Sequence, residues 1–589
     1  MIRFTEEDRL LEPLAQEGAQ AGTGAAVALQ DKEIEYYRLP GVGTYTSIEP
    51  LKGVYGTWGP LNGRDHSIRQ WWFPNAVDSL YQFGAPLIAT YGYDGENRTT
   101  AALSDSVKKA RLSVCVDDLS QRDEIIFKVE LFDDGAWQQE NGEVILRIDR
   151  RPVAYYDALR DAGAWMRGFL ELTAPVPEGA VQPLYSSWYN FHQEPQQELL
   201  LRELEAAAKI GFRTVILDDG WQFEGKCTGD YYKCGDWAVA ADKFPDFKAF
   251  ADAVHRLGMK LMMWFPVPFA GYATEEYRRL RDKIAFNVDG MRAGVLDVRY
   301  PDIREHIIGI YERFVKEYGI DGLKLDFVDA FRADPSAVAP FDPAMDYRSL
   351  DKATRRLMRD IYTRLTAKHP DFLFEFRQNY IGAEIVSNCN MLRVGDCAAD
   401  PVTNRVGIAA IRLVNAATAP HSDMLLWGRA ETPENCMRQM LNIMFSVPQI
   451  SVLLTEIPEA QAAAVRRFVN YWSDNRDVLL GGVFRAPVPG GNYALLSSET
   501  ADRKITVLYE TSTAELTHPC EDIWNCTDKP FFAAVTDGTD GYRYKVFDWR
   551  GVAVRTGSIP AGSTAARIQV PSGGMAQFER TAPREAEAL

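Results

Sequence analysis

The chain has 589 residues, of which 46% are hydrophobic and 25% charged, and its formal net charge is −17. A chain of this length exceeds one ordinary core, so the composition predicts a globular protein of about two to four packed units and excludes a disordered one. The acidic balance and the scattered basic residues disfavour a nucleic-acid partner, because phosphate binding needs clustered lysine and arginine.

The amino-terminal sequence MIRFTEEDRL has early acidic residues and no apolar signal-peptide core, and no later window approaches ~18 apolar residues. The eight cysteines form no C-x-x-C pair and no zinc-type spacing. We therefore expect a cytoplasmic protein with reduced thiols, without a metal, a cofactor or a membrane contact. In an exported protein, Cys227 with Cys234 and Cys520 with Cys526 would be close enough to form disulfides.

Residues 30–150 read as short alternating strands between Gly, Asp and Asn turns, as in Ala110–Val116. Between residues 155 and 175 apolar residues recur at helical intervals and are followed by a proline-rich break. We therefore predict an N-terminal β-sandwich domain over residues 1–165.

The next ~300 residues alternate short apolar runs with amphipathic helices, which is typical of a parallel sheet. Eight such runs favour a closed (β/α)8 TIM barrel over residues 166–477, because an open doubly wound sheet usually has fewer repeats and often a glycine-rich phosphate turn. After residue 478 alternating runs return and predict a C-terminal antiparallel β-sandwich domain over residues 478–589. The predicted barrel strands are 184–188, 214–217, 260–264, 322–325, 373–376, 391–394, 424–427 and 450–454.

Polar side chains close several of these strands, at the barrel face where strand ends converge on one pocket. Alternate residues of a strand share a face, so Lys324 and Asp326 point the same way, as do Glu375 and Arg377. A lysine beside Asp326 keeps this carboxylate ionised, which suits a nucleophile attacking an anomeric carbon. Asp396, two strands further round, suits the general acid, which needs an environment that keeps it protonated.

Carboxylates and indoles follow the second and third predicted strands. A carboxylate can accept two hydrogen bonds from adjacent sugar hydroxyls, and an indole packs against the apolar face of a pyranose. Asp218, Asp219, Trp221 and Trp264 supply these groups. A strand-end aspartate is as often a helix cap, and a lone tryptophan is more often core, so the prediction depends on their joint placement.

These motifs resemble those of glycoside hydrolase family 36, in the clan that holds the α-galactosidases. The stretch Asp218-Asp-Gly-Trp221 is similar to the family's sugar-binding motif, and Lys324-x-Asp326 is similar to its nucleophile motif. Arg393-Val-Gly-Asp396 resembles the arginine that contacts the sugar and the acid/base of the shorter members. Contact with Arg393 would lower the pKa of Asp396, and Asp400 is an alternative acid.

The resemblance implies a retaining, exo-acting, α-galactosidase-like hydrolase that takes an oligosaccharide or glycoside and forms a homo-oligomer. Asp326 is then the nucleophile and Asp396 the acid/base. The N-terminal domain of such enzymes sends an aromatic side chain into the pocket, and the segment 69–73 makes Trp71 the candidate. A transglycosylase, which passes the sugar from the same covalent intermediate to another sugar, is an alternative.

The chain departs from the family after the fifth predicted strand, where galactosidases show Cys and small residues and this chain has Glu375, Arg377, Gln378 and Asn379. One interpretation is an internal salt bridge between Glu375 and Arg377. The other is that Arg377 reads a carboxylate, an N-acetyl carbonyl or an unusual hydroxyl pattern on the substrate. An N-acetylgalactosaminide or a uronide is then the alternative substrate.

Other classes fit less well. A Schiff-base lyase would use Lys324, but a carboxylate on the same face opposes the neutral amine that it needs. Only His192 and His421 fall near strand ends, which is too few for a metal-dependent hydrolase. A non-catalytic sugar-binding barrel stays open. Asp329 could cap the helix that follows it or line the pocket, and we expect the cap.

Overall fold

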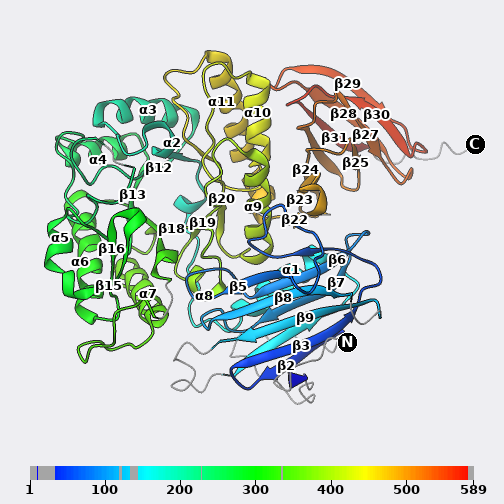
Figure 1. Cartoon of the computed structure of the whole chain (residues 1–589). Coiled ribbons are helices and arrows are strands. Elements are labelled where there is room, and N and C mark those ends of the chain that lie inside the picture. The colour runs from blue at the N-terminus through cyan, green and yellow to red at the C-terminus, as the bar shows by residue number, and fades with distance from the viewer. Residues whose placement is uncertain are drawn as a thin grey trace, which may run out of the picture.

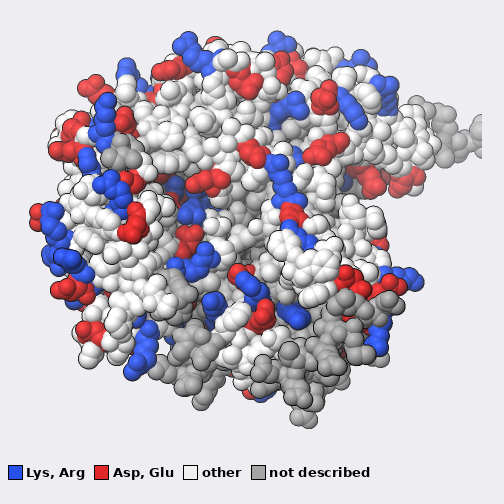
Figure 2. Space-filling model, viewed as in Figure 1, with Lys and Arg blue, Asp and Glu red and all other residues white. Residues whose placement is uncertain are grey.

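The computed structural model describes residues 9–10, 33–118, 122–132, 143–226, 229–332, 336–487 and 489–581. Three parts follow one another along the chain (Figure 1): β-sheets in blue, a barrel with helices in cyan to yellow, and further sheets in orange to red. Figure 2 shows acidic and basic side chains interspersed over one face, without an extended patch of either sign.

The N-terminal part is a sandwich of two five-stranded sheets, with orders β1-β3-β9-β8-β5 and β2-β10-β7-β6-β4. Alternation along strands such as β5, whose residues are buried and exposed in turn, gives each sheet one apolar face. Leu112 and Val129 of the first sheet pack with Ile88 and Leu146 of the second to form the core. The strands are β1 Arg9–Leu10, β2 Ile34–Leu39, β3 Gly43–Pro50, β4 Val54–Trp58, β5 Asn75–Ser79, β6 Leu87–Gly92, β7 Asn97–Leu103, β8 Ala110–Asp117, β9 Glu124–Leu131 and β10 Val144–Asp149.

Helix α1 (Tyr155–Arg167) joins the sandwich to both other parts. Its first residue, Tyr155, donates a hydrogen bond to the carbonyl of Ala486 in the C-terminal part. Further along, Gly163 allows close approach to the barrel, since a Cβ there would lie 2.4 Å from the carbonyl oxygen of Val414. The three parts are therefore packed together through one helix.

The central part is a ring of eight parallel strands in the order β20-β19-β18-β17-β13-β12-β11-β21. A parallel bridge between His421 of β20 and Val447, just before β21, links the two ends of the sheet. This closure confirms the (β/α)8 barrel. The strands are β11 Leu184–Ser186, β12 Thr214–Leu217, β13 Lys260–Pro266, β17 Gly322–Asp326, β18 Leu373–Arg377, β19 Met391–Arg393, β20 Ala419–His421 and β21 Gln449–Ile450.

The prediction for the seventh barrel strand was wrong. The strand is Ala419–His421, and residues 424–427 lie in the loop beyond it, where Leu425 makes an isolated bridge to Ile450. The true strand is three residues long and contains Pro420, so it has no apolar run to reveal it. Met424 and Leu425 are apolar because the loop buries them, so the sequence of this loop resembled that of a buried strand.

Helices cover the outside of the ring, and a small sheet interrupts it between β13 and α6. That sheet has the order β14-β16-β15, with β14 Phe269–Gly271, β15 Ile284–Val288 and β16 Ala293–Leu296. The helices and single turns are η1 Glu178–Val181, α2 Trp188–Phe191, α3 Gln197–Ile210, α4 Phe247–Arg256, α5 Glu275–Arg279, η2 Arg281–Lys283, η3 Asp289–Met291, α6 Pro301–Tyr318, η4 Val328–Phe331, α7 Leu350–Lys368, α8 Ala383–Val386, α9 Pro401–Val414, α10 Pro433–Asn442, α11 Glu459–Asp474 and α12 Arg476–Gly481. In the described residues, no helix has the length and hydropathy to cross a membrane.

The C-terminal part has a seven-stranded sheet, β22-β23-β24-β26-β31-β28-β29, and a three-stranded sheet, β25-β27-β30. Most pairs are antiparallel, as expected, but β24 pairs with β26 and β25 with β27 in parallel. The elements are β22 Val483–Arg485, η5 Pro489–Gly491, β23 Leu495–Glu499, β24 Arg503–Leu508, β25 Thr513–Glu515, β26 Cys520–Asn525, β27 Phe531–Val535, β28 Gly541–Phe547, β29 Ala553–Ile559, β30 Ala565–Gln569 and β31 Met575–Thr581.

Candidate active site

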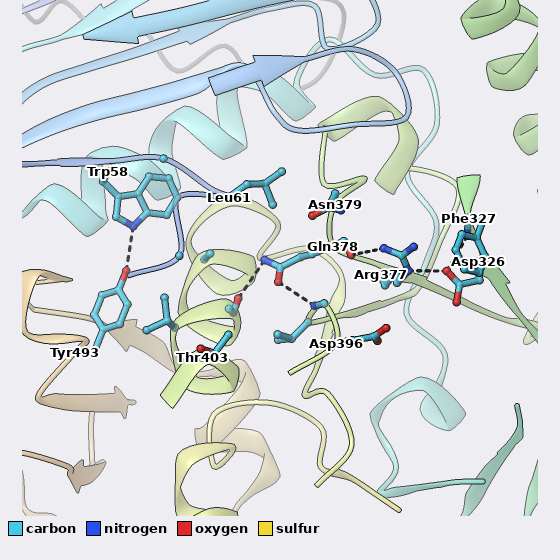
Figure 3. Close-up of a pocket in the computed structure, with 17 residues that line it drawn as sticks. Trp58, Leu61, Asp326, Phe327, Arg377, Gln378, Asn379, Asp396, Thr403 and Tyr493 are labelled. Atoms are coloured by element: carbon cyan, nitrogen blue, oxygen red, sulfur yellow. Dashed lines mark hydrogen bonds and ion pairs between the residues drawn. The ribbon is translucent and has the colours of Figure 1, made fainter. Parts of the chain in front are cut away.

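A pocket of about 410 Å³ lies where the three parts of the molecule meet (Figure 3). Barrel strand ends supply its polar wall, with Asp326 after β17, Arg377 at the end of β18 and Asp396 after β19. Trp58 of the N-terminal sandwich and Tyr493 of the C-terminal part close the opposite end, where the Trp58 indole N–H donates to the Tyr493 hydroxyl at 3.0 Å. The remaining lining residues are Gly59, Leu61, Gly63, Phe327, Gln378, Asn379, Val394, Gly395, Thr403, Val406, Gly407 and Ala410.

Asp326 accepts three hydrogen bonds. Arg377 Nε donates to Oδ1 at 2.6 Å, and Trp264 Nε1 donates to Oδ2 at 3.0 Å. The third donor is the backbone N–H of Phe327, 2.7 Å from Oδ1. Phe327 has φ +57°, a left-handed conformation that is rare outside glycine, so the chain turns sharply here.

The environment of Asp326 keeps its carboxylate ionised. Burial by itself raises the pKa of Asp326, but the positive charges of Arg377 and Lys324 outweigh burial and hold this pKa well below its usual range. Hydrogen bonds from Trp264 and Arg377 add to the stabilisation of the charged form. Asp326 is therefore in the state that a nucleophile requires at neutral pH.

Lys324 links Asp326 to the two aspartates after β12. Its Nζ donates to Asp218 Oδ2 at 2.6 Å, and Asp218 Oδ1 accepts the backbone N–H of Asp219 at 2.9 Å. Asp219 accepts side-chain amide bonds from Gln193 and Gln222, while burial raises the pKa of Asp219 to about 7. Neither aspartate is among the described residues that line the pocket, and both are 2% exposed or less.

The predicted tryptophans have different positions. Trp264 contacts Asp326, and its ring stacks on Tyr231 with 6.0 Å between centroids. Trp221 is fully buried against Phe265 and Phe314, with its indole N–H on the carbonyl of Trp264, so it lies in the core and not on the pocket.

Trp71 is 44% exposed and does not line the pocket in the part of the chain that the structure describes. Its neighbours Trp72 and Phe73 are also exposed. Trp58, which was not singled out from the sequence, is the aromatic that the N-terminal sandwich sends to the pocket. Trp58 lies on a strand without a charged neighbour in sequence, so the sequence gave no indication that it lines the pocket.

Glu375 and Arg377 do not pair with each other, which contradicts the internal salt bridge. Arg377 reaches β17, where its Nε contacts Asp326 and its Nη2 lies 3.4 Å from Asp329 Oδ1. Glu375 lies near β19, with its Oε1 3.5 Å from Arg393 Nε. Side chains on adjacent strands approach within about 5 Å, whereas residues two apart on one strand are separated by about 6.6 Å, so cross-strand partners are favoured.

Two carboxyls therefore have roles that differ from expectation. Asp329 is an ion-pair partner of Arg377 within η4, and not a helix cap. Glu375 is fully buried and accepts a hydrogen bond from Gln449 Nε2. Burial raises the pKa of Glu375 to about 7, although Arg393 and Lys324 oppose the rise.

Asp396 contacts Arg393, the interaction that was expected to oppose its acid role. Arg393 Nη2 donates to Asp396 Oδ1 at 2.9 Å, while Nη1 donates to the buried Asp423. Desolvation raises the pKa of Asp396, but Arg393 and Lys324 outweigh it and hold this pKa below its usual value. The side chain of Asp396 is still 60% exposed, so its environment can change when a ligand covers it.

Asp400 has a structural role at the start of a helix. It accepts the backbone N–H of Thr403 at 3.0 Å as the N-cap of α9 and pairs with Arg64 of the N-terminal sandwich. Asp423, by contrast, belongs to the Arg393 cluster, where Tyr189 Oη and the backbone N–H of Cys397 donate to its Oδ2 at 2.9 and 2.8 Å. Sequence reasoning missed Asp423 because the seventh strand was placed after it rather than before it.

The structure also bears on the rival chemistries. Burial lowers the pKa of Lys324, but Asp218 and Asp326 more than offset this and raise it, which opposes Schiff-base formation. Among the described residues, no group of three or more His, Cys, Asp and Glu has the arrangement of a metal site. Both ring nitrogens of His421 are engaged, Nε2 with the carbonyl of Ala180 at 2.8 Å and Nδ1 with Gln449 at 3.1 Å.

Barrel enzymes have their active sites at this end of the strands, and glycosidases place two carboxylates on one pocket, as Asp326 and Asp396 are placed here. The Melibiase family model matches residues 180–383. An α-galactosidase of Lactobacillus acidophilus is 27% identical over 202 residues, 33% of this chain and 26% of that protein. Over the segment that the family model matches, the chain is thus similar to α-galactosidases of this type.

A second relative, the A type blood α-D-galactosamine galactosaminidase of Flavonifractor plautii, is 23% identical over 245 residues, 37% of this chain and 21% of the relative. The chain thus aligns with about a quarter of the length of these curated relatives. A family 36 α-galactosidase of Geobacillus stearothermophilus, solved in complex with stachyose, has a TM-score of 0.60 at 15% identity. That likeness covers 93% of this chain and 80% of the other, and it extends the shared fold over all three parts.

Proposed function

We propose that this protein is a retaining, exo-acting α-glycosidase that removes a terminal α-linked galactose-type sugar by double displacement. The observation that carries the proposal is that ionised Asp326 and the exposed carboxylate of Asp396 face one pocket from nearby strand ends. The similarity to an α-galactosidase and to a galactosaminidase supports a galactose-type sugar. The stachyose bound to the solved relative supports an oligosaccharide substrate.

The two oxygens of Asp326 are not equivalent in this proposal. Oδ1 accepts both Arg377 and the Phe327 N–H, whereas among the described residues Oδ2 accepts only the Trp264 indole. Oδ2 therefore has the freer lone pair, and it forms the bond to the anomeric carbon. As that bond forms, the glycosidic C–O bond breaks, and Asp396 gives its proton to the departing oxygen.

The second step runs in reverse through the same groups. Asp396, now a carboxylate, takes a proton from water, the water oxygen bonds to the anomeric carbon, and the ester bond to Asp326 breaks with return of its electron pair. The three donors around Asp326 stabilise the released carboxylate. Two inversions give net retention. A sugar hydroxyl in place of water would give transglycosylation by the same step.

The electrostatics suit the two roles of Asp396 at different moments. In the free protein Arg393 favours the carboxylate form, which is the base of the second step. When a sugar covers the exposed side chain it removes water from the carboxylate, and desolvation raises the pKa toward the acid form of the first step. The low pKa of Asp396 in the free protein is thus compatible with acid catalysis by Asp396 in the complex.

A panel of nitrophenyl α- and β-glycosides tests the activity, and proton NMR of the first-formed sugar tests the stereochemistry. We expect turnover of an α-galactoside-type substrate and an α-configured product. A 2-deoxy-2-fluoroglycosyl fluoride traps the covalent intermediate, and peptide mapping should place the label on Asp326. A β-configured first product, or a label on another residue, would overturn the double displacement. Binding of the sugars without turnover would indicate the non-catalytic alternative.

We also propose a cytoplasmic location and a homo-oligomer. The described cysteines at positions 115, 234, 389, 397, 436, 520 and 526 are free thiols, which supports a reducing compartment. Cys227 lies outside the described residues. The exposed Trp71, Trp72 and Phe73 provide apolar surface that a second copy can cover. Light scattering after size exclusion tests assembly, and a mass equal to one chain would contradict it.

A further inference from the structure

A second recess lies between the N-terminal sandwich and the barrel. It has a volume of about 350 Å³, and its wall consists of Leu80 and Lys109 from the sandwich and, from the barrel, the end of η4, residues 338–341 and the start of α7. A neighbouring hollow of about 330 Å³ shares Leu80, Lys109 and Arg332 with it, so the two form one space, which we call the interface recess. None of the described residues in its wall lines the active-site pocket. Its size is that of a site for a small molecule.

Three cations in the wall of the interface recess have no carboxylate partner in the part of the chain that the structure describes. These exposed side chains are Lys109, Arg332 and Arg348. The other two arginines of the wall are paired, Arg111 with Asp78 at 2.6 Å and Arg299 with Asp297 at 2.6 Å. Ion pairs within the protein therefore account for only part of the positive charge in this wall.

The remaining carboxylate of the described wall does not balance this charge. Asp351 accepts a hydrogen bond from Gln82 Nε2 at 2.6 Å, and it is one negative charge against three positive ones. Like charges gathered in one recess repel one another, and an anion that binds between them offsets the repulsion. The chain has a formal net charge of −17, so a local excess of cations does not follow from its overall composition.

Aromatic rings hold two of these cations in place. Arg332 Cζ lies 3.9 Å from the centroid of the Phe83 ring, and Arg348 Cζ lies 4.3 Å from the centroid of the Phe341 ring. A guanidinium over the face of a ring keeps the N–H groups at its edge for other acceptors. The two guanidinium groups are therefore positioned and have donors for a ligand, and the Lys109 ammonium adds three more.

Charge and apolar surface together indicate the class of ligand. A phosphate monoester carries about −1.5 to −2 charges at pH 7 and three strong acceptor oxygens, whereas a carboxylate carries one charge and two oxygens. Three cations match the phosphate better. Beside them Phe331, Val338 and Phe341 form an apolar part of the wall, and Phe341 is 40% exposed. A ring attached to the phosphate can pack against this part.

We propose that the interface recess binds a small organic phosphate monoester, with the phosphate between Lys109, Arg332 and Arg348 and the attached ring against Phe341. Sugar phosphates and nucleoside monophosphates share this chemistry. The site is separate from the active-site pocket, so this proposal does not depend on the proposed function.

Titration calorimetry of the full-length protein at neutral pH and low salt tests the proposal, with glucose 6-phosphate and adenosine 5′-monophosphate as probes. We expect saturable binding of at least one of them with a Kd below about 1 mM, and the two probes distinguish a sugar from a nucleotide as the source of the phosphate. Glucuronate, which has a single charge, and inorganic phosphate, which has no ring, should each bind this site at least about tenfold more weakly. The affinity should fall as salt is added.

Arg332→Gln and Arg348→Gln each remove one charged donor, so each should raise the Kd of the bound phosphate by about tenfold or more. Both side chains are exposed, so the thermal midpoint should stay unchanged. Arg567→Gln is the matched control, because Arg567 is an exposed arginine of the C-terminal part whose Cζ lies 3.7 Å from the centroid of the Phe531 ring. This control should bind the phosphate with the Kd of the wild type.

Three results would overturn the proposal. The first is the lack of saturable binding of either organic phosphate. The second is a Kd that Arg332→Gln and Arg348→Gln leave unchanged, or that Arg567→Gln raises equally, since the phosphate would then bind elsewhere or through the net charge alone. The third is equally tight binding of glucuronate or inorganic phosphate with the same loss in Arg332→Gln, since the recess would then not recognise the second charge or the ring.

Discussion

Replacing Asp326 by asparagine should weaken the structure of the site as well as its chemistry. All three partners of Asp326 are donors, namely Arg377, the Phe327 N–H and Trp264. An amide has one acceptor oxygen and one donor nitrogen, so at least one partner must face an NH2 group. Loss of one charge-assisted bond and of the ion pair, with Arg377 still held by Asp329, gives an expected cost of about 3 kcal/mol.

The orientation of that amide is testable with a double-mutant cycle. If the oxygen keeps Arg377 and Phe327, the NH2 group faces the Trp264 indole N–H. Trp264→Phe should then cost about 1.5–3 kcal/mol in the wild type but less than about 1 kcal/mol in the Asp326→Asn background. Native-state hydrogen exchange of peptides from β13 and β17 measures the local free energies of opening.

Trp427→Phe is the matched control for this cycle, since the buried Trp427 indole N–H has no hydrogen-bond partner among the described residues and lies far in sequence from β17. Its cost should be the same in both backgrounds. Additive costs for Trp264→Phe and Asp326→Asn, to within about 0.5 kcal/mol, would refute the bonding of Asp326 described above.

Three further outcomes are expected. Asp396→Asn should slow cleavage of unactivated glycosides by about 10²–10⁴-fold, with azide restoring turnover of nitrophenyl glycosides, while Asp400→Asn retains catalysis. Lys324→Met should lower the thermal midpoint sharply, because it leaves Asp218 buried without its cation, at about 3–5 kcal/mol. The pKa of Glu375, raised by burial from 4.5 to about 7, contributes stability below pH 4.5 that is lost as pH rises through 7, and Glu375→Gln should flatten this decline in a pH series of melting curves.

The periodicity of the sequence was sufficient for the barrel, because a parallel strand that is buried on both faces must be a run of apolar residues. The run at Thr214–Leu217 coincides with β12, and the run at 322–325 differs from β17 by one residue. The seventh strand was not predictable in this way. Its three residues are set by pairing with β19, which depends on neighbours distant in sequence.

The predicted strand ends indicated which side chains could lie close together, but they did not indicate which of these side chains form ion pairs. Alternation placed Lys324 and Asp326 on one face, and the lowering of the Asp326 pKa by Lys324 follows from that placement. Whether Arg377 turns toward Glu375 or toward Asp326 depends on distances across the sheet, which a single sequence does not contain. Trp58 and Tyr493 were equally hidden, because their contact joins positions 435 residues apart.

That contact makes the pocket a product of the whole chain. The family model stops at residue 383, so the segment that it matches supplies Asp326 and Arg377, whereas Asp396, Trp58 and Tyr493 lie outside it. The pocket therefore combines side chains of the matched segment with side chains from a later barrel strand end and from both flanking β parts. Substitution or exchange of the flanking β parts can therefore alter which glycosides enter the pocket while the reaction stays the same. An excised barrel should lose substrate selectivity before it loses catalytic activity.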